Sequence, residues 1–379
     1  MLFQLSEEHL MIQKAARDFA VQECLPGVIE RDEKQLFPKE QIKKLGELGF
    51  MGMMVDPAYG GAGMDTISYV LAMEEISKVE ASVSVCMSVN NSLVCWGLEK
   101  YGTEAQKQKY LVPLAKGEII GAFLLSEPEA GSDATHQRTV AEDKGDHYLV
   151  SGTKNWITNG NSASVYLVMA QTDASKGSHG INTLIIEKNS PGVTVAAKEN
   201  KMGIRASDTC TILFTDVKVP KENRIGDDGF GFKFAMKTLA GGRIGIASQA
   251  LGIASGAYER SLAYAKERKA FGTEIMNHQA IAFKLADMAT RIEAARLLIF
   301  KSAWEKDNGQ DYTLSSSMAK VFASETAMWV TTEAVQIHGG YGYVKEYHVE
   351  RMMRDAKITQ IYEGTSEVQR IVIGRTVLK

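Results

Sequence analysis

The sequence has no arrangement of cysteine or histidine that would bind a metal. It contains four cysteines and seven histidines, and no CxxC, HExxH or similar ligand spacing occurs among them. The cysteines stand far apart, at Cys24, Cys86, Cys95 and Cys210, and suggest no disulfide framework. We therefore expect neither a metal site nor a fold held by disulfides.

The chain also lacks an excess of charge and a long apolar run. Its formal net charge is -3 and its pI is about 6.2, so it has no polycationic surface for nucleic acid or an anionic membrane. No apolar run approaches the roughly 18 residues of a membrane helix. The N-terminus carries early acidic residues and an amphipathic rhythm, unlike a signal or transit peptide. We expect a cytoplasmic protein with no nucleic-acid or membrane partner.

Three nucleotide and hydrolase motifs are absent as well. GxGxxG, GxxxxGK[ST] and GxSxG do not occur, so dinucleotide binding by a βαβ unit, P-loop phosphoryl transfer and a nucleophile-elbow hydrolase all lack their signatures. The glycine clusters that do occur, GGAG, GFGF and GGYG, each indicate a turn when taken singly.

The periodicity of the apolar residues changes twice along the 379 residues. Helical spacing extends from residue 6 to about 118, and it returns after GDDGFGF (226–232). Between these regions lie short runs rich in Val, Ile and Thr, separated by Gly, Asn, Asp and Lys, which are typical of an antiparallel β unit. We predict an α+β fold with an N-terminal helical domain (1–120), a middle β domain (121–231) and a C-terminal helical domain (232–379).

A carboxylate lies in an unusual position in QIYEGTSEVQ (360–369). Ser366 followed by Gln369 fits a capping box, with the apolar residues of a helix directly after it, so Glu363 should lie in irregular chain before that helix. Taken alone, Glu363 would be a solvated loop acid, since most carboxylates do no chemistry.

Two further segments have the composition of a ligand site. FLLSEPEAGS (123–132) leads from an apolar strand into small hydroxyl, proline and glycine residues, which expose backbone N–H groups to a polar ligand or simply form a turn. KNWITNG (154–160) places Trp156 on a strand beside a threonine and a glycine turn. This indole either covers the face of a planar ring system or belongs to the core.

Together with RKAFG (268–272), QIHGG (336–340) and MRDAK (353–357), these segments resemble, in the same order, the motifs of the acyl-CoA dehydrogenase family. The family's members are flavoproteins that desaturate acyl-CoA thioesters. The resemblance covers essentially the whole chain and implies a C-terminal four-helix-bundle domain. The segments 87–93 and 242–252 look most like those of the short-chain, or butyryl-CoA, members.

The resemblance implies a role for Glu363 as the base that removes the α proton. Burial beside Tyr362, flavin and acyl chain should raise its pKa, and Gly364 lets the thioester approach the backbone. The rival acid Glu367 falls in the first helical turn, where the helix dipole favours a carboxylate. Some relatives place the base one residue before the arginine of GGR, but that position here is Gly242.

The resemblance also implies contacts for substrate and cofactor. Arg243 should help organise the base, the alternative being a cation on the helix surface. Ala240 replaces an aspartate usual in short-chain members, which puts one CoA contact in doubt. Substrate contacts fall on Ser132, Gly242, Arg243, Tyr362 and Gly364. Contacts to FAD fall on Phe123, Leu125, Ser126, Gly131, Ser132, Trp156, Ile157, Thr158, Thr365 and Glu367.

A second set of FAD contacts implies that the flavin is shared between subunits. Its members match the segments that hold the pyrophosphate and adenosine of a flavin seated mainly on a neighbouring subunit: Arg268, Phe271, Gln279, Gln336, Ile337, Gly339 and Gly340. The family's arrangement is a homotetramer built from two dimers.

The expected substrate is butyryl-CoA, with neighbouring C4 to C6 thioesters also used. No Arg or Lys lies between Glu80 and Glu99, where glutaryl-type relatives place a cation, so a charged acyl tail is disfavoured. Electrons would pass to an electron-transfer flavoprotein. An acyl-CoA oxidase, an oxidase of another carbon acid such as a nitroalkane, and a helical scaffold that has lost flavin remain as alternatives.

Overall fold

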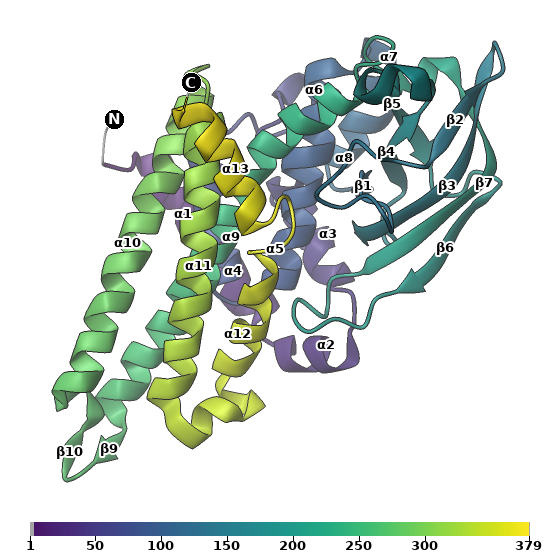
Figure 1. Cartoon of the computed structure of the whole chain (residues 1–379). Coiled ribbons are helices and arrows are strands. Elements are labelled where there is room, and N and C mark those ends of the chain that lie inside the picture. The colour runs from purple at the N-terminus through teal and green to yellow at the C-terminus, as the bar shows by residue number, and fades with distance from the viewer. Residues whose placement is uncertain (1–3, 379) are drawn as a thin grey trace.

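The computed structural model describes residues 4–378, which form a helical N-terminal part, a central sheet and a bundle of long helices (Figure 1). Both helical parts flank one side of the sheet, and the chain returns to them after completing it. The predicted fold class is thereby confirmed. The N-terminal helices are α1 (Glu7–Phe19), α2 (Val28–Lys34), α3 (Lys39–Glu47), α4 (Thr66–Ser77), α5 (Ala81–Ser88), α6 (Trp96–Tyr101), α7 (Glu104–Gln106) and α8 (Val112–Ala115).

Helix α1 shows how the sequence forms this layer. Ser6 accepts a hydrogen bond from the His9 backbone N–H, and the His9 side chain returns to the Ser6 N–H, which closes a capping box. Ile12, Ala16 and Phe19 then recur on one buried face, and this face packs against α4. Helix α4 is buried almost throughout, which places Tyr69 inside the protein.

One helical run corrects the expectation that no segment is apolar enough to span a membrane. Residues Ala81–Tyr101 form 21 helical residues, and their best window has a mean hydropathy of 1.2. By length and composition this run passes the test for a membrane span. However, 94% of the window is buried inside the protein, against α4, α9 and the sheet, so the run occupies the position of a core helix.

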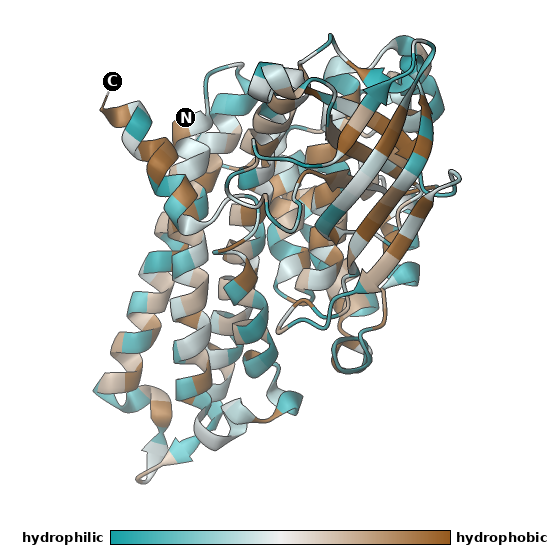
Figure 2. Ribbon diagram, turned by 45° about the vertical axis from the view of Figure 1, so that its right-hand side comes forward, coloured by the Kyte–Doolittle hydropathy of each residue, from teal (hydrophilic) through white to brown (hydrophobic). Residues whose placement is uncertain are grey.

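The central sheet has eight strands in the order β6-β7-β3-β2-β4-β5-β8, with β1 paired to β4. Most pairs are antiparallel, as expected, but β1 runs parallel to β4, with Gly121 opposite Val165. Hydrophobic and hydrophilic residues alternate along its long strands (Figure 2). The strands are β1 (Gly121–Leu124), β2 (Val140–Asp143), β3 (His147–Thr158), β4 (Val165–Gln171), β5 (Ile181–Glu187), β6 (Val193–Lys198), β7 (Thr209–Pro220) and β8 (Arg224–Ile225).

The C-terminal part consists of three long helices and two shorter ones. Helices α9 (Gly231–Glu267), α10 (Gln279–Asp307) and α11 (Thr313–His338) pack together, and α12 (Val349–Ile358) completes the bundle against α9 and α11. The last helix is α13 (Ser366–Val377), and a small hairpin, β9 (Lys269–Ala270) with β10 (Thr273–Glu274), joins α9 to α10. Because α9 also packs against α4, the two helical parts share a core.

Candidate functional site

The loop that joins α12 to α13 lies on the side of the bundle that faces the sheet (Figure 1). Two successive residues of this loop have left-handed backbone angles, with φ 51° at Glu363 and φ 94° at Gly364. Glycine adopts this conformation freely, whereas a glutamate there costs about 1 kcal/mol or more. Such strain persists only where the surroundings enforce it, and strained residues concentrate at functional sites.

Two side chains hold the carbonyl groups of this loop. The Gln369 amide donates to the Glu363 carbonyl at 3.2 Å and to the Gly364 carbonyl at 3.0 Å. Lys320 Nζ, from α11, donates to the same Gly364 carbonyl at 2.6 Å. The left-handed pair is therefore fixed from both sides.

The predicted capping box at Ser366 is wrong. The N-cap of α13 is Thr365, whose hydroxyl accepts from the Val368 N–H at 3.3 Å. The physical reason is that the Gln369 side-chain amide donates to the loop carbonyls, while the Ser366 N–H, which a capping box would use, donates to the Gln360 carbonyl at 3.0 Å. Glu367 lies exposed in the first turn of α13, where its own backbone N–H and the Thr365 hydroxyl hold its pKa below the usual value.

The carboxyl group of Glu363 is enclosed, so the interpretation of a solvated loop acid is wrong. Its Oε2 is inaccessible to solvent and has no hydrogen-bond partner within residues 4–378. Burial raises the pKa of Glu363 to about 7, although the charges of Lys320 and Arg243 act in the opposite direction. This carboxyl therefore ionises near neutral pH.

Gly242 provides the space for this carboxylate. An ideal Cβ at this position of α9 would fall well inside 3.0 Å of Glu363 Oε2, and 2.8 Å from Leu93 Cδ2. No other residue type fits without displacing one of these groups. Leu93, from the helical segment Val89–Cys95, is thus an apolar wall beside the carboxylate.

Arg243 is buried rather than on the helix surface. Its side chain is 7% exposed and donates through Nη1 to Ser317 Oγ at 3.2 Å, while its Nε has no partner within the described residues. Burial lowers the pKa of Arg243, and the Glu363 charge partly offsets this effect. Next along the loop, the Tyr362 hydroxyl donates to Gln249 Oε1 of α9.

Four buried polar atoms around this loop lack hydrogen-bond partners in residues 4–378. Because buried polar atoms are nearly always paired, with protein, water or ligand, this concentration is typical of a binding site. The four atoms are Glu363 Oε2, Arg243 Nε, Ser366 Oγ and Gln369 Oε1.

Trp156 lies at the surface, which excludes the alternative that it belongs to the core. The register of β3 against β7 shifts between Lys154 and Ile157, and within this bulge Trp156 has φ 63°. Its side chain is therefore 60% exposed, while the neighbouring Ile157 is buried. Thr158 ends the strand.

The segment that follows β1 runs beside this bulge. The Asn155 N–H donates to the Ser126 carbonyl at 2.8 Å, and Lys154 Nζ donates to the Leu125 carbonyl at 3.0 Å. Phe123 stacks on Phe234 of α9, with ring centroids 6.4 Å apart. Further along, Gly131 and Ser132 are exposed. The two predicted flavin segments therefore lie together, anchored at their apolar ends.

The second predicted FAD set lies elsewhere on the chain. Arg268, Ile337, Gly339 and Gly340 line one pocket of about 480 Å³, together with Tyr264 and Tyr341. Arg268 and Ile275 of this lining flank the β9–β10 hairpin, which lies at the end of the bundle far from the sheet (Figure 1). Gln279 and Gln336 are exposed, and Phe271 is 98% exposed with φ 52°. One chain alone does not bring this set to Trp156.

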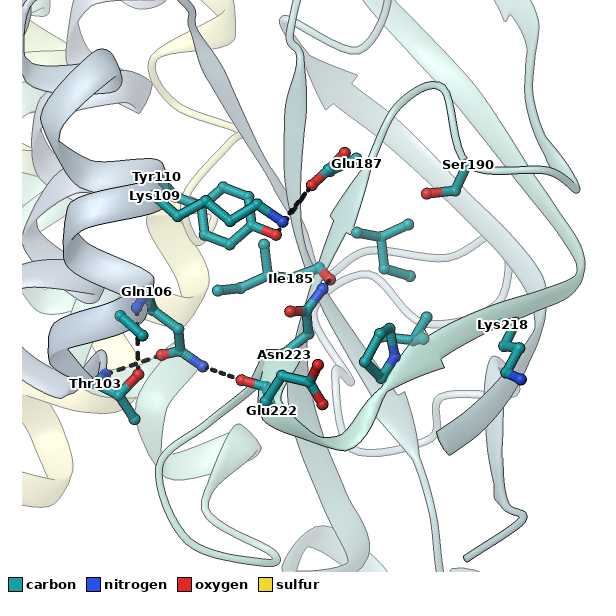
Figure 3. A pocket seen from close by; sticks show the side chains of 14 residues that line it. Thr103, Gln106, Lys109, Tyr110, Ile185, Glu187, Ser190, Lys218, Glu222 and Asn223 are labelled. Atoms are coloured by element: carbon teal, nitrogen blue, oxygen red, sulfur yellow. Dashed lines mark hydrogen bonds and ion pairs between the residues drawn. The ribbon is translucent and has the colours of Figure 1, made fainter. Parts of the chain in front are cut away.

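A pocket of about 390 Å³ between α7 and the sheet has a different character (Figure 3). Most of its polar side chains are already paired with one another or with backbone. Lys109 pairs with Glu187 at 2.9 Å, Gln106 donates to the Glu222 carbonyl at 2.7 Å, and Asn223 donates to the Ile185 carbonyl at 2.9 Å. We therefore place the candidate site at Glu363.

Comparison with known proteins identifies the family of this chain. Three family models match successive regions: "Acyl-CoA dehydrogenase, N-terminal domain" at residues 6–118, "Acyl-CoA dehydrogenase, middle domain" at 122–217 and "Acyl-CoA dehydrogenase, C-terminal domain" at 229–378. The chain belongs to the acyl-CoA dehydrogenase family. Within this family it is 51% identical, over 100% of both chains, to the short-chain specific acyl-CoA dehydrogenase of Clostridium acetobutylicum.

Two solved structures of the acyl-CoA dehydrogenase fold are similar over the full length. The butyryl-CoA dehydrogenase of Megasphaera elsdenii has a TM-score of 0.98, 50% identity and 100% coverage of both chains. A chain from the structure described as "Electron transferring flavoprotein of Acidaminococcus fermentans: Towards a mechanism of flavin-based electron bifurcation" has a TM-score of 0.99, 51% identity and the same coverage.

Sequence patterns missed three residues of the site: Lys320, Gln369 as a residue that holds the loop, and Tyr69, whose pKa is raised by burial and in part by the charge of Glu363. For Lys320 a signal exists, because it lies on the stripe of α11 formed by Ser316, Ala319, Ala323 and Ala327, all fully buried. A lysine on such a stripe needs a buried partner. For Tyr69 and Gln369 no local pattern points to the loop.

Proposed function

We propose that this chain is an FAD-dependent dehydrogenase of short-chain acyl-CoA thioesters, with butyryl-CoA preferred and Glu363 as the base. The observation that supports this most directly is the enclosed, unpartnered carboxylate oxygen of Glu363 facing a helix position that has no side chain, Gly242. The relatives named for short-chain and butyryl-CoA substrates support the substrate class.

Proton removal is the first task of the site. The α proton of a thioester is weakly acidic, and a base acts best when its pKa lies near the working pH. With a pKa raised to about 7, the Glu363 carboxylate is both present at neutral pH and basic enough to take this proton. A bound acyl chain along Leu93 would exclude the remaining water and strengthen the base further.

Polarisation of the thioester carbonyl is the second task. The Glu363 backbone N–H donates to no group within residues 4–378, although the carbonyls around it are held by Gln369 and Lys320. We assign this N–H to the thioester oxygen, where charge develops as the α proton leaves. Gly364, which follows it, leaves the approach to the backbone open. Ser132 and Tyr362 complete the proposed substrate contacts.

The described residues fit a flavin. Trp156 presents an exposed ring, and the segment beside it ends in exposed small residues that a flat polar ligand can approach. FAD, when bound, supplies the acceptor for the hydride that leaves the β carbon. We assign the flavin ring to Phe123, Leu125, Ser126, Gly131, Ser132, Trp156, Ile157, Thr158, Thr365 and Glu367.

The distance of the second set from Trp156 supports a shared cofactor. We propose that Arg268, Phe271, Gln279, Gln336, Ile337, Gly339 and Gly340 of one subunit hold the diphosphate and adenosine of a flavin on another, in a homotetramer. Arginine suits a diphosphate. The exposed Phe271, Phe283 and Tyr343 at this end of the bundle are 98%, 60% and 85% exposed, which is typical of a surface covered by a partner.

The site and the relatives support a short, uncharged acyl chain for the substrate and a flavoprotein as the electron acceptor. Leu93 beside the carboxylate gives an aliphatic wall, and the segment from residue 81 to 98 offers no cation for a charged acyl tail. Ala240 is buried and apolar, so we expect one CoA contact fewer than an aspartate would give. We propose an electron-transfer flavoprotein as acceptor, because a similar chain occurs in the structure described for the electron transferring flavoprotein of Acidaminococcus fermentans.

An anaerobic titration of the purified protein with butyryl-CoA tests this function. Bleaching of the flavin absorbance by butyryl-CoA, and less by long-chain or glutaryl thioesters, is the expected result. A colourless protein that takes up no FAD would contradict the proposal, as would a flavin that butyryl-CoA fails to reduce. Admission of air then distinguishes an oxidase, because only an oxidase forms peroxide in proportion to substrate.

A further inference from the structure

Lys320 is a buried cation without a surface role. Its side chain is 0% exposed, and it lies in the middle of α11 on a stripe of small residues. Burying an ammonium group is costly unless it is paired or hydrogen-bonded. Within residues 4–378, its only hydrogen bond is to the Gly364 carbonyl, at 2.6 Å. Its position therefore depends on the loop that carries Glu363.

The Gly364 carbonyl is a specific target for this ammonium. It belongs to the second of the two left-handed residues, and it also accepts from Gln369 at 3.0 Å. Lys320 thus contributes a charged hydrogen bond, which is roughly twice as strong as a neutral one, at the point where the backbone conformation is least favourable. Without Lys320, the buried Gly364 carbonyl would accept only the hydrogen bond from the Gln369 amide.

The charged and titratable groups around Glu363 come from four elements. Arg243 approaches from α9, Lys320 from α11 and Tyr69 from α4, and Tyr362 belongs to the loop itself. Burial raises the pKa of both tyrosines above their ordinary value, so they stay neutral near pH 7. Of the two cations, Lys320 exerts the larger effect on the Glu363 carboxyl.

We propose that Lys320 is the positioning residue of the base: its ammonium fixes the Gly364–Thr365 peptide directly after the base and keeps the neighbouring carboxylate ionised in the substrate-free enzyme. This inference rests on the proposed role of Glu363. Arg243 cannot substitute for it, because its Nη1 is directed to Ser317.

The test compares pH profiles of kcat/KM for butyryl-CoA. Lys320→Met removes the donor and the charge at similar length, Lys320→Arg retains both, and Lys306→Met is the matched control. Burial lowers the pKa of both Lys320 and Lys306 to about 8, but Lys306 contacts Met54 Sδ at 3.3 Å and not the loop. All variants are measured as flavin-loaded protein.

Removal of the charge should shift the acid limb of the Lys320→Met profile upward by about one pH unit or more. Below both pKa values this corresponds to a loss of about tenfold in kcat/KM, which is recovered at high pH. Lys320→Arg and Lys306→Met should keep the acid limb of the parent. An unshifted limb in Lys320→Met, or an equal loss at every pH, would overturn the proposal.

A second measurement does not depend on the stability of the Lys320 variants. Difference infrared spectroscopy of the parent protein against Glu363→Gln follows the protonated carboxyl of Glu363 directly. We expect its signal to disappear as pH rises through about 7. A carboxyl that is still mostly protonated at about pH 8 would overturn the proposal, since the Lys320 ammonium, whose pKa burial lowers to about 8, would then not keep it ionised.

Failure of the two proposals can be told apart. If Glu363→Gln retains turnover, the proposed function fails at its base. If Glu363→Gln is inactive but Lys320→Met keeps the parental acid limb, only the role of Lys320 is refuted.

Discussion

The glycine pair in the middle of α9 gives a sharp test of the site. Gly242→Ala would place a methyl group well inside 3.0 Å of Glu363 Oε2, so the oxygen must retreat by about 1 Å to reach an ordinary carbon–oxygen contact. A misplacement of about 1 Å at a reacting group costs about 100-fold in rate, or about 2.7 kcal/mol of barrier. We expect kcat for butyryl-CoA to fall by about this factor.

The neighbouring glycine supplies the matched control. At Gly241 an added Cβ would meet only the Tyr312 hydroxyl, at 3.8 Å, which is an ordinary contact. Since alanine favours a helix over glycine by up to about 1 kcal/mol, Gly241→Ala should fold at least as well as the parent. Gly242→Ala should instead lose about 1–3 kcal/mol, because the methyl also presses on Leu93 Cδ2.

The assay measures butyryl-CoA turnover with an artificial electron acceptor, together with flavin content and thermal unfolding, for both variants. Flavin content should be unchanged in each, since neither glycine is among the proposed FAD contacts. If Gly242→Ala turns over butyryl-CoA as fast as Gly241→Ala does, the carboxylate does not work from the observed position, and the reasoning is refuted.

Three further outcomes follow from the same geometry. Glu363→Gln should keep FAD and thioester binding but lose most turnover, by a factor of about 100 or more; near-parental kcat in stopped-flow reduction would exclude this base. Because burial raises the Glu363 pKa to about 7, ionisation of Glu363 destabilises the folded parent protein as pH rises from about 5 to about 8. The melting temperature of Glu363→Gln should therefore rise relative to that of the parent over this interval. A difference in melting temperature that stays constant with pH would contradict this. Arg268→Ala should lower both the flavin content, measured by absorbance, and the tetramer content, measured by light scattering. If neither content falls, the result counts against a shared cofactor.

Most of the architecture could be predicted from the sequence. Apolar residues at helical spacing, and short runs of β-branched residues between turn residues, were sufficient for the order helix, sheet, helix, because burial of one face is a local property of each segment. The parallel pairing of β1 with β4 was not accessible in this way, since strand direction depends on the connection and not on composition.

Expectations from local patterns were wrong in two places. Ser366 with Gln369 satisfies the capping-box pattern, yet Thr365 caps the helix, because the Gln369 side-chain amide is held by the hydrogen bonds that it donates to two loop carbonyls. The run Ala81–Tyr101 is apolar enough to cross a membrane, yet it is enclosed by α4, α9 and the sheet. The run is buried by partners distant in sequence, whereas the carbonyls that hold Gln369 lie only five and six residues away along the chain.

Some features of the candidate site could likewise be predicted from the sequence, and others depend on the tertiary structure. The sequence by itself determined that a carboxylate precedes a glycine at the start of a helix, that a tryptophan lies on a strand, and that position 242 has no side chain. Only the tertiary structure decided that the carboxylate is enclosed against Gly242, that Trp156 faces outward and that Lys320 meets the loop. The physical reason is that a pKa, an exposed ring and a buried ion each depend on neighbours from several elements, which folding alone brings together.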